Sequence, residues 1–394
     1  MGSRKTCLLV TNLFPPAIGG SSQVYAALAA HAAGEIIVLT SSHDYETGLE
    51  REDWRTLDRK AGYPVHRLRC VRPFLRGLYA GAVRYRLHEL AIALNLAVTV
   101  VRLAWRYRVK AICIADDETV GWLTLLSRFV LRRNTLIYCH GDDLTGPQNV
   151  TRRSRWFGLA HRIVAANRHA ESLLASRYGV PADKIVLIQN GVDLDVFHPG
   201  PAPQELVQRY GLGGRLVLLT VTRLVPRKGV DKVLEALPAM AAQFPGILYL
   251  VVGEGPQRAA LEERVRTLGI ASWVIFAGAV PHAAARDFYN AAQLVLLPNR
   301  EEAGEADGLP LVFLEANACG KPVIGGMAGG TAEIVRDGEN GILLDGRDPD
   351  AIARAVCSLL GDEKRREKMG GVGLLMAQDW GWESRTLSFL QACR

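Results

Sequence analysis

Short apolar runs rich in Val, Ile and Leu alternate with longer amphipathic stretches along the whole chain. Strands that are buried on both faces have few polar positions, so this alternation predicts parallel sheets with helices on both sides. The runs predicted as strands are 7–12, 36–40, 65–68, 111–115, 135–139, 162–165 and 185–188 in the first half, and 216–221, 248–252, 274–277, 294–297, 323–325 and 341–344 in the second. The pattern therefore predicts an α/β fold with two doubly wound sheets.

The chain has 394 residues, a length that favours two domains. The proline-rich segment His198–Pro203 cannot continue a helix or a sheet interior, so it indicates a linker. We expect two Rossmann-like domains that face each other across a cleft. The predicted boundaries are 1–197 for the first domain, 198–212 for the linker, 213–378 for the second domain and 379–394 for a last helix that returns to the first domain. In such sheets ligands bind beyond the carboxyl ends of the strands, so the loops that follow strands matter most.

The charge of the chain is unevenly distributed. Residues 1–200 carry 26 Lys and Arg against 17 Asp and Glu, whereas residues 201–394 carry 21 against 23. The first half therefore has all the excess positive charge, which predicts an anionic partner such as a phosphorylated substrate, a membrane surface or nucleic acid. A composition with 49% hydrophobic and 22% charged residues excludes a disordered chain.

The cysteines and the longest apolar stretch both favour a soluble, intracellular chain. The seven Cys are scattered and form no Cys-x-x-Cys pair, which predicts buried thiols in a reducing compartment. The stretch Leu90–Val101 is shorter than the roughly 20 residues that a membrane span needs, so we expect a mostly buried helix there. The chain is predicted to be cytoplasmic, with membrane contact at the surface only.

Two loops of the first half follow predicted strands and have residues suited to a site. Gly19 and Gly20 precede a predicted helix, where paired glycines let a backbone approach a phosphate; the alternative is a bare turn. His140 stands at the end of a strand and is followed by Gly141. This position predicts that the His140 ring points toward the ligand-binding edge of the sheet. The alternative is a His that only satisfies a local turn.

In the second half, the loop after strand 216–221 carries the densest group of cations. Arg223 offers a planar fork for two phosphate oxygens and Lys228 a compact charge, so the pair can neutralise a diphosphate leaving group. Arg227 is predicted to be a solvated neighbour. A solvated basic turn is the alternative for the whole group.

Two further loops of the second half have candidate chemistry. Gly253 and Gly255 suit a sharp turn from strand to helix, and they fit a scaffold role or a ligand contact equally well. Asp307 and Glu315 flank a loop and a helix start, and carboxylates there can accept sugar hydroxyls. Because Glu315 lies inside an apolar run, it needs a partner, which favours function over two solvated acids.

The sequence gives no support to several other classes. There is no Gly-x-Gly-x-x-Gly and no P-loop, which removes the main signals for a dinucleotide dehydrogenase and a P-loop NTPase. The triplets Asp193–Asp195 and Asp348–Asp350 do not follow core strands, so no metal site is predicted. No nucleic-acid-binding module is recognised, and no nucleic-acid partner is expected.

Taken in order, these motifs resemble those of the retaining glycosyltransferases of family 4, which have the GT-B fold. The motifs are the Gly-Gly loop, His-Gly-x-Asp at 140–143, Asn-Gly-Val-Asp at 190–193, Arg223 with Lys228-Gly, Gly-x-Gly-Pro at 253–256 and Asp307-x7-Glu315-Ala. The resemblance extends from about residue 7 to the end of the chain. In one departure, the first carboxylate of the last motif is usually Glu in the family but is Asp307 here, and its shorter side chain shifts any contact with sugar hydroxyls.

The resemblance implies a site for a nucleotide-diphosphate sugar and no catalytic metal or other cofactor. The residues implied in catalysis are His140, Arg223, Lys228 and Asp307. The residues implied in donor binding are Gly19, Gly20, Arg223, Lys228, Gly253, Gly255, Gly278, Val280, Asp307, Gly308, Leu309, Pro310 and Glu315. Within this set, Arg223 and Lys228 would bind the diphosphate, Glu315 the ribose and His140 the donor sugar.

The acceptor is expected on the first domain, where arginines are interleaved with aromatic residues. Arg69, Arg72, Arg76, Arg84 and Arg86 are the candidates for contact with an anionic or lipid-linked acceptor or an anionic membrane surface; the alternative is a solvated basic face. We therefore expect a hexosyltransferase that uses a UDP- or GDP-sugar in polysaccharide or glycolipid synthesis. A nucleotide-sugar epimerase, a phosphorylase and a non-catalytic sugar-nucleotide-binding protein are the alternatives, and the oligomeric state is not predicted.

Overall fold

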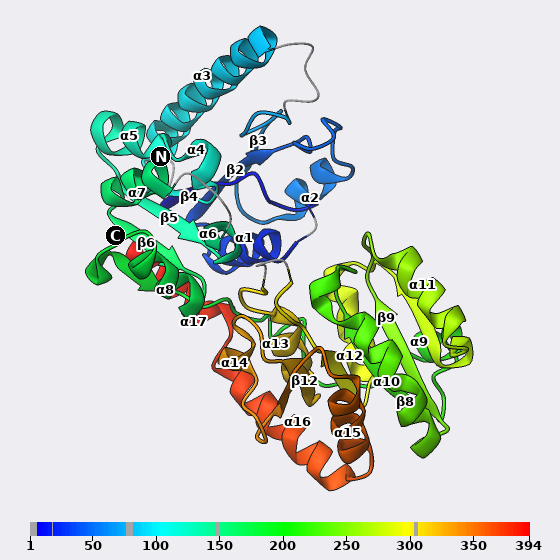
Figure 1. The fold of residues 1–394 in the computed structure, drawn as a ribbon. Coiled ribbons are helices and arrows are strands. Elements are labelled where there is room, and N and C mark those ends of the chain that lie inside the picture. The colour runs from blue at the N-terminus through cyan, green and yellow to red at the C-terminus, as the bar shows by residue number, and fades with distance from the viewer. Residues whose placement is uncertain (1–5, 18, 76–81, 146–149, 303–305) are drawn as a thin grey trace. The chain divides into compact units, whose positions relative to one another are not determined.

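The computed structural model describes residues 6–17, 19–75, 82–145, 150–302 and 306–394. It divides into two compact units, residues 1–190 with 382–394 and residues 191–381 (Figure 1). The first unit therefore ends before the predicted boundary at residue 197. The segment 198–212, predicted as a linker, lies inside the second unit and contains the helix α9 (Gln204–Arg209).

The first unit is built on a parallel sheet of seven strands in the order β3-β2-β1-β4-β5-β6-β7. Its strands are β1 (Cys7–Val10), β2 (Ile36–Ser41), β3 (Val65–Leu68), β4 (Ala111–Ile114), β5 (Asn134–Cys139), β6 (Arg162–Ala165) and β7 (Ile185–Leu187). Its helices are α1 (Gly20–His31), α2 (Trp54–Lys60), α3 (Ala82–Tyr107), α4 (Asp117–Val120), α5 (Leu123–Leu125) continued by a π-helical segment (Leu126–Leu131), α6 (Asp142–Thr145), α7 (Val150–Leu159), α8 (Arg168–Ser176) and α17 (Trp382–Ala392).

The last helix of the chain, α17, packs within the first unit. Its Phe389 ring lies 6.3 Å from the ring of Tyr138 on β5. The amide of Asn134 donates a hydrogen bond of 3.1 Å to the carbonyl of Arg394. The chain therefore returns to its first unit after completing the second.

The second unit has a parallel sheet of six strands in the order β10-β9-β8-β11-β12-β13. Its strands are β8 (Leu216–Val221), β9 (Ile247–Val252), β10 (Val274–Gly278), β11 (Leu294–Leu297), β12 (Val323–Gly326) and β13 (Gly341–Leu344). Besides α9, its helices are α10 (Val230–Gln243), α11 (Arg258–Thr267), α12 (Ala285–Ala291), α13 (Leu311–Ala318), α14 (Thr331–Ile334), α15 (Pro349–Leu360) and α16 (Glu363–Gln378), with short 3₁₀ turns at Pro226–Lys228 and His282–Ala284.

Both sheets are covered on two faces, as the apolar runs predict. In the second unit Leu218 and Tyr249 belong to a core that includes α10 and α15, whereas their neighbours Leu219 and Leu250 belong to a core that includes α12 and α13. Successive strand residues point to opposite faces, so each strand contributes to both cores. The predicted α/β fold and all predicted strands are confirmed, and the seven Cys are free thiols, buried except for Cys357.

The helix α3 corrects one prediction. The stretch Leu90–Val101 was expected to be a mostly buried helix, but it belongs to a helix of 26 residues. Within the described residues α3 is the one helix that is long and apolar enough to cross a membrane, and 28% of its most apolar window is buried. Figure 1 shows α3 extending beyond the other elements of the first unit. The prediction was wrong because apolar residues occupy two opposite faces of α3, and the core covers only one.

Candidate functional site

The carboxyl edge of the second sheet brings together the loops that follow β8, β11 and β12. The strand order reverses between β8 and β11, which is where doubly wound sheets bind ligands. The backbone N–H of Arg300 donates to the carbonyl of Arg227 at 2.8 Å, and that of Gly330 donates to the carbonyl of Asp307 at 3.0 Å. These bonds fix the three loops to one another, so side chains from distant parts of the sequence meet at this edge.

A carboxylate held by two cations occupies this edge. Lys228 Nζ lies 2.7 Å from Asp307 Oδ1, and Arg227 Nε donates to the same oxygen at 3.1 Å. The Asp307 side chain is 6% exposed, and the side chains of Arg227 and Lys228 are each 15% exposed. Arg227 is therefore not the solvated neighbour that the sequence predicted. It was misjudged because the loop after β11 supplies the partner from 80 residues away.

The second oxygen of this carboxylate is the most informative atom of the site. Asp307 Oδ2 is buried and accepts no hydrogen bond from the residues that the structure describes. A buried carboxylate oxygen without a donor is costly, so it marks a place where a ligand hydroxyl or water completes the site. The predicted neighbours Gly308, Leu309 and Pro310 follow directly and lead into α13, whose first N–H groups have no partner inside the helix.

Arg223 differs from the two paired cations. It follows β8 and is exposed, and its side chain has no ion pair or hydrogen bond within the described part of the chain. Its guanidinium therefore keeps its donors for a ligand or for solvent. The structure thus places Arg223 and Lys228 on one loop, in different states of pairing.

The glycines predicted near the donor have a scaffold role that the structure makes explicit. A Cβ on Gly253 would lie 1.8 Å from the carbonyl oxygen of Thr222, and a Cβ on Gly255 would lie 2.5 Å from that of Leu224. The backbone N–H of Gly253 also donates to the carbonyl of Gly278 at 2.8 Å. The loops after β8, β9 and β10 are therefore packed backbone against backbone, and Val280, two residues after Gly278, is partly exposed.

We expect Gly329→Ala to displace the backbone of Asp307 and so to disturb the site. Gly329 has φ +56°, and a Cβ there would lie 1.9 Å from the carbonyl oxygen of Asp307. The variant should lose about 2–4 kcal/mol of unfolding free energy and weaken ligand binding at Asp307, because the loop must shift. Gly338→Ala is the control: its φ of +77° imposes the same kind of strain, but nothing lies within 4 Å. Equal melting temperatures of the two variants would contradict the expectation.

Glu315 has two partners that the sequence prediction missed. On α13, its Oε1 lies 2.7 Å from His282 Nε2, and its Oε2 accepts a hydrogen bond of 2.7 Å from Tyr289 Oη. Glu315 is 6% exposed, which explains why it needs both donors. His282 lies in the loop four residues after β10, so a His that follows a strand, the signal that drew attention to His140, was also present here in the sequence.

Glu315 affects the pKa of both of its partners. Burial acts to lower the pKa of His282, but its hydrogen bond to Glu315 and the charges of Glu315 and Asp193 outweigh burial and raise that pKa. Burial and then the charge of Glu315 hold the pKa of Tyr289 well above its ordinary value. Each oxygen of Glu315 retains a second lone pair, so a ligand hydroxyl can still be accepted.

In the first unit, His140 lies among aromatic rings at the carboxyl end of β5. Its Nε2 lies 2.8 Å from the hydroxyl of Tyr25 on α1, and its ring is 5.0 Å from that of Tyr138. Its backbone N–H donates to Asp143 Oδ1 at 3.0 Å, as does that of Gly141 at 2.8 Å. Burial lowers the pKa of His140 to about 4, so this imidazole is neutral near pH 7.

The two histidines should give the melting temperature opposite pH dependences. An unfolded His titrates near 6.5, so between about pH 4 and pH 6.5 the unfolded chain binds a proton that folded His140 does not, and stability falls as the pH is lowered. His282 has a raised pKa, and its contribution is largest at low pH and is lost as pH rises through that pKa. Thermal melts between about pH 5 and pH 8 should show the His140→Gln loss shrinking at low pH and the His282→Gln loss growing. Parallel curves would contradict this assignment.

The remaining predicted residues of the first unit lie outside the His140 environment. Gly19 and Gly20 are exposed at the start of α1. Arg69 lies over the Phe74 ring at 5.9 Å, and Arg72 lies over Tyr45 at 4.2 Å and 3.7 Å from Asp116. Arg84 and Arg86 are exposed on α3, and Arg86 is 3.5 Å from Glu89. Arg76 lies outside the described residues.

The two Asp-x-Asp triplets have local structural roles. Asp193 Oδ1 accepts hydrogen bonds from the backbone N–H groups of Asp195 and Val196 at 3.1 and 3.2 Å. Asp348 caps the start of α15 by accepting from Asp350 and Ala351 at 2.9 and 3.1 Å. Both triplets are thus accounted for by turn and cap geometry.

Comparison with known proteins agrees with this geometry over nearly the whole chain. The family model for glycosyl transferases group 1 matches residues 204–373, and the model for glycosyltransferase family 4 matches residues 18–196. The GDP-mannose-dependent alpha-(1-6)-phosphatidylinositol monomannoside mannosyltransferase of Mycolicibacterium smegmatis is 31% identical over 388 residues, covering 96% of this chain and 95% of its own. A GDP-mannose-dependent monoacylated alpha-(1-6)-phosphatidylinositol monomannoside mannosyltransferase of Corynebacterium glutamicum is 30% identical over 392 residues, covering 97% and 95%.

The solved structures share the fold. The Anabaena protein HepE, crystallised with UDP and glucose, superposes with a TM-score of 0.78 at 21% identity, covering 98% of this chain and 99% of its own. A glycosyltransferase from Rickettsia africae gives a TM-score of 0.78 at 16% identity, covering 99% and 98%. Together with the family matches, these likenesses confirm the predicted GT-B architecture of two Rossmann-like domains. The chain belongs to the group 1 glycosyltransferases of family 4.

Proposed function

We propose that this chain is a retaining hexosyltransferase that moves a sugar from a nucleotide diphosphate to a hydroxyl of a lipid-linked acceptor. GDP-mannose is the donor that we favour, because relatives of nearly full length are GDP-mannose-dependent enzymes that act on phosphatidylinositol monomannoside. The observation that carries the proposal is the Asp307 site. It combines a buried carboxylate oxygen that lacks a hydrogen-bond donor with Lys228 and, on the same loop, with Arg223, whose side chain has no partner among the described residues.

Each group at this edge suits one part of a nucleotide sugar. Arg223 and Lys228 match the diphosphate in charge, and a bidentate guanidinium fits its oxygens. Asp307 Oδ2 would accept a hydroxyl of the sugar, and the first N–H groups of α13 would donate to the same part of the donor. Glu315, held in place by His282, would accept the ribose hydroxyls.

The chemistry follows from the charges that develop when the sugar–phosphate bond breaks. Positive charge builds at the anomeric carbon and negative charge on the leaving diphosphate, and Arg223 and Lys228 would stabilise the latter. We propose that these side chains make a catalytic metal unnecessary. In retention, the acceptor hydroxyl attacks on the face that the diphosphate leaves, and a phosphate oxygen takes its proton. A neutral His140 would orient the sugar rather than remove a proton.

Donor binding can be tested without knowing the acceptor. GDP-mannose, UDP-glucose and ADP-glucose are each added with EDTA, and the melting temperature is measured, since a ligand that binds only the folded chain raises it. We expect one nucleotide sugar, GDP-mannose first, to raise the melting temperature of the wild type and to have a smaller effect on Arg223→Ala. A shift that requires a divalent cation would contradict metal independence, and no shift with any of the three would contradict the donor site.

A further inference from the structure

The helix α3 has an apolar face that the core does not cover. Six large apolar side chains on α3 are between 58% and 74% exposed. They are Val83, Leu87, Leu90, Leu94, Val98 and Trp105, here called the outer stripe. At about 100° per residue their spacing of three, four and seven places them on one side of the helix. A continuous exposed stripe of this length marks an interaction surface, because single exposed apolar residues are common but rows of them are not.

The opposite side of α3 is anchored in the core of the first unit. Ile92, Leu96, Val100 and Leu103 are each no more than 8% exposed. The helix therefore has two apolar faces, and its inner face is already occupied by protein. A helix held in this way can lie along a surface with its outer stripe facing outward, which is the arrangement of interfacial helices.

The charges beside the outer stripe are those that an anionic surface would attract. Arg84, Arg86, Arg102 and Arg106 are exposed on α3, whereas Glu89 is its only acidic residue and is paired with Arg86 at 3.5 Å. Between Leu90 and Val101 the helix carries no charged residue. Two copies of this chain joined through the stripe would bring arginines against arginines, which disfavours a second copy as the occupant.

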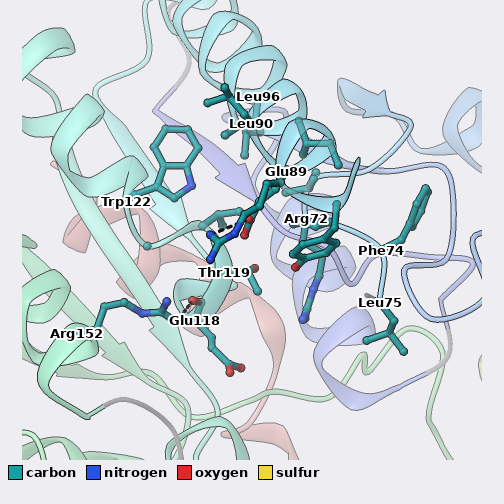
Figure 2. A pocket seen from close by; sticks show the side chains of 18 of the residues that line it. Arg72, Phe74, Leu75, Glu89, Leu90, Leu96, Glu118, Thr119, Trp122 and Arg152 are labelled. Carbon is teal, nitrogen blue, oxygen red and sulfur yellow. Dashed lines mark hydrogen bonds and ion pairs between the residues drawn. The ribbon is translucent and has the colours of Figure 1, made fainter. Parts of the chain in front are cut away.

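A basic pocket adjoins the outer stripe at Leu90. The pocket has a volume of about 860 Å³ and is lined by residues of α3, α4, α7 and the loop that follows β3. Three cations, Arg72, Arg86 and Arg152, outnumber the two acids of its lining, Glu89 and Glu118, and Trp122 provides an aromatic wall. Figure 2 shows Arg72, Leu90, Trp122 and Arg152 around this space. Its size and charge suit an anionic headgroup, while the stripe beside it suits the apolar layer below such headgroups.

We propose that the outer stripe docks the first unit onto an anionic lipid bilayer, with the basic pocket facing the headgroups. This inference deepens the proposed function, since an acceptor carried by a lipid is met at a bilayer surface. It also gives a role, attraction to an anionic bilayer, to part of the excess positive charge in the first half of the chain. The stripe supplies shallow apolar contact and the arginines supply attraction, and neither alone gives stable binding.

Vesicle binding tests the docking surface without any sugar nucleotide. The full-length chain is sedimented with vesicles of phosphatidylcholine and phosphatidylglycerol, and with pure phosphatidylcholine vesicles. We expect retention on the anionic vesicles that weakens as salt is raised. Leu87→Gln with Leu94→Gln should reduce the bound fraction by about tenfold or more, since Gln keeps helix propensity but removes apolar contact.

Matched variants separate docking from folding. Leu57→Gln with Leu387→Gln changes two exposed leucines, 40% and 61% exposed, on other helices of the first unit and should bind like the wild type. Arg102→Gln with Arg106→Gln should weaken binding to anionic vesicles and leave the melting temperature unchanged. Binding of the Leu87/Leu94 variant equal to that of the wild type would overturn the proposal. The proposal would also be overturned if the wild type were a dimer that bound no vesicles and the Leu87/Leu94 variant were a monomer.

The outcome is separable from that of the proposed function. A wild-type chain that transfers the sugar but is not retained on anionic vesicles would overturn the docking surface alone. Vesicle retention without transfer from any nucleotide sugar would overturn the transferase and leave the docking surface standing.

Discussion

Replacing Lys228 with Ala should lower kcat/KM for the nucleotide sugar by about a hundredfold or more. A buried or half-buried donor aimed at charge that develops in the transition state is worth roughly 10²–10³ in rate. Lys228 is 15% exposed and points its ammonium at the edge where the diphosphate is expected. The effect should fall mainly on kcat, because negative charge on the diphosphate grows as the bond breaks.

Lys232→Ala is the matched control for this change. Lys232 lies one helical turn further along, on α10, and pairs with Glu235 at 2.8 Å. The Lys232→Ala substitution removes the same charge from the same unit but outside the proposed donor site, so steady-state rates should stay within about twofold of the wild type. Equal rates for both variants would remove Lys228 from the transition state.

Replacing Asp307 with Asn should lower activity to a similar extent and also cost stability. The variant keeps the shape of the side chain but leaves Lys228 and Arg227 without their counter-ion and puts an amide where a sugar hydroxyl is expected to donate. We expect kcat to fall by about a hundredfold. Because the pair is partly exposed, the loss of unfolding free energy should be about 1–3 kcal/mol, less than for a fully buried pair.

Asp231→Asn distinguishes the site from an ordinary ion pair at the same edge. Asp231 binds Arg300 through both oxygens, at 2.9 and 3.1 Å, and is 32% exposed. It should lose no more than about 1 kcal/mol and keep its activity. If Asp307→Asn lost stability but not activity, Asp307 would be a structural anchor for the loop and not part of the donor site.

The strands of this protein were predictable because burial on both faces leaves few polar positions to confuse the pattern. The run Leu294–Leu297 is apolar at every position and the run Leu216–Val221 at all but Thr220, and turn residues follow both. Such a pattern depends only on neighbours in the sequence, so the strands can be recognised without knowledge of the tertiary fold.

The helix α3 shows where the same reasoning fails. Hydrophobic residues at helical spacing predict an apolar face, but the sequence does not say which of two apolar faces the core covers. Ile92 and Leu96 belong to the covered face, whereas Leu90 and Leu94 belong to the exposed one. The helix was therefore predicted correctly as a helix and wrongly as a buried one.

The sequence predicted which loops form the site but not which side chains pair with one another there. The loops after β8 and β11 were singled out from their cations and carboxylates, but pairing of Arg227 with Asp307 depends on the sheet order. The partners of Glu315 are set by the packing of α12 against α13, and Tyr289 sits in an ordinary helical pattern that gives no signal. Contacts of this kind arise from topology, which local sequence does not encode.

The central claim is transfer of a hexosyl unit from a nucleotide sugar with retention of configuration, and one measurement tests it directly. Purified chain is incubated with GDP-mannose, an inositol-containing mannolipid acceptor and EDTA, and the anomeric configuration of the product is read by NMR. An α-linked donor should give an α-linked mannosyl lipid, formed by the wild type and strongly reduced in Lys228→Ala. A β-linked product would contradict retention, and release of free mannose without a lipid product would contradict the transferase.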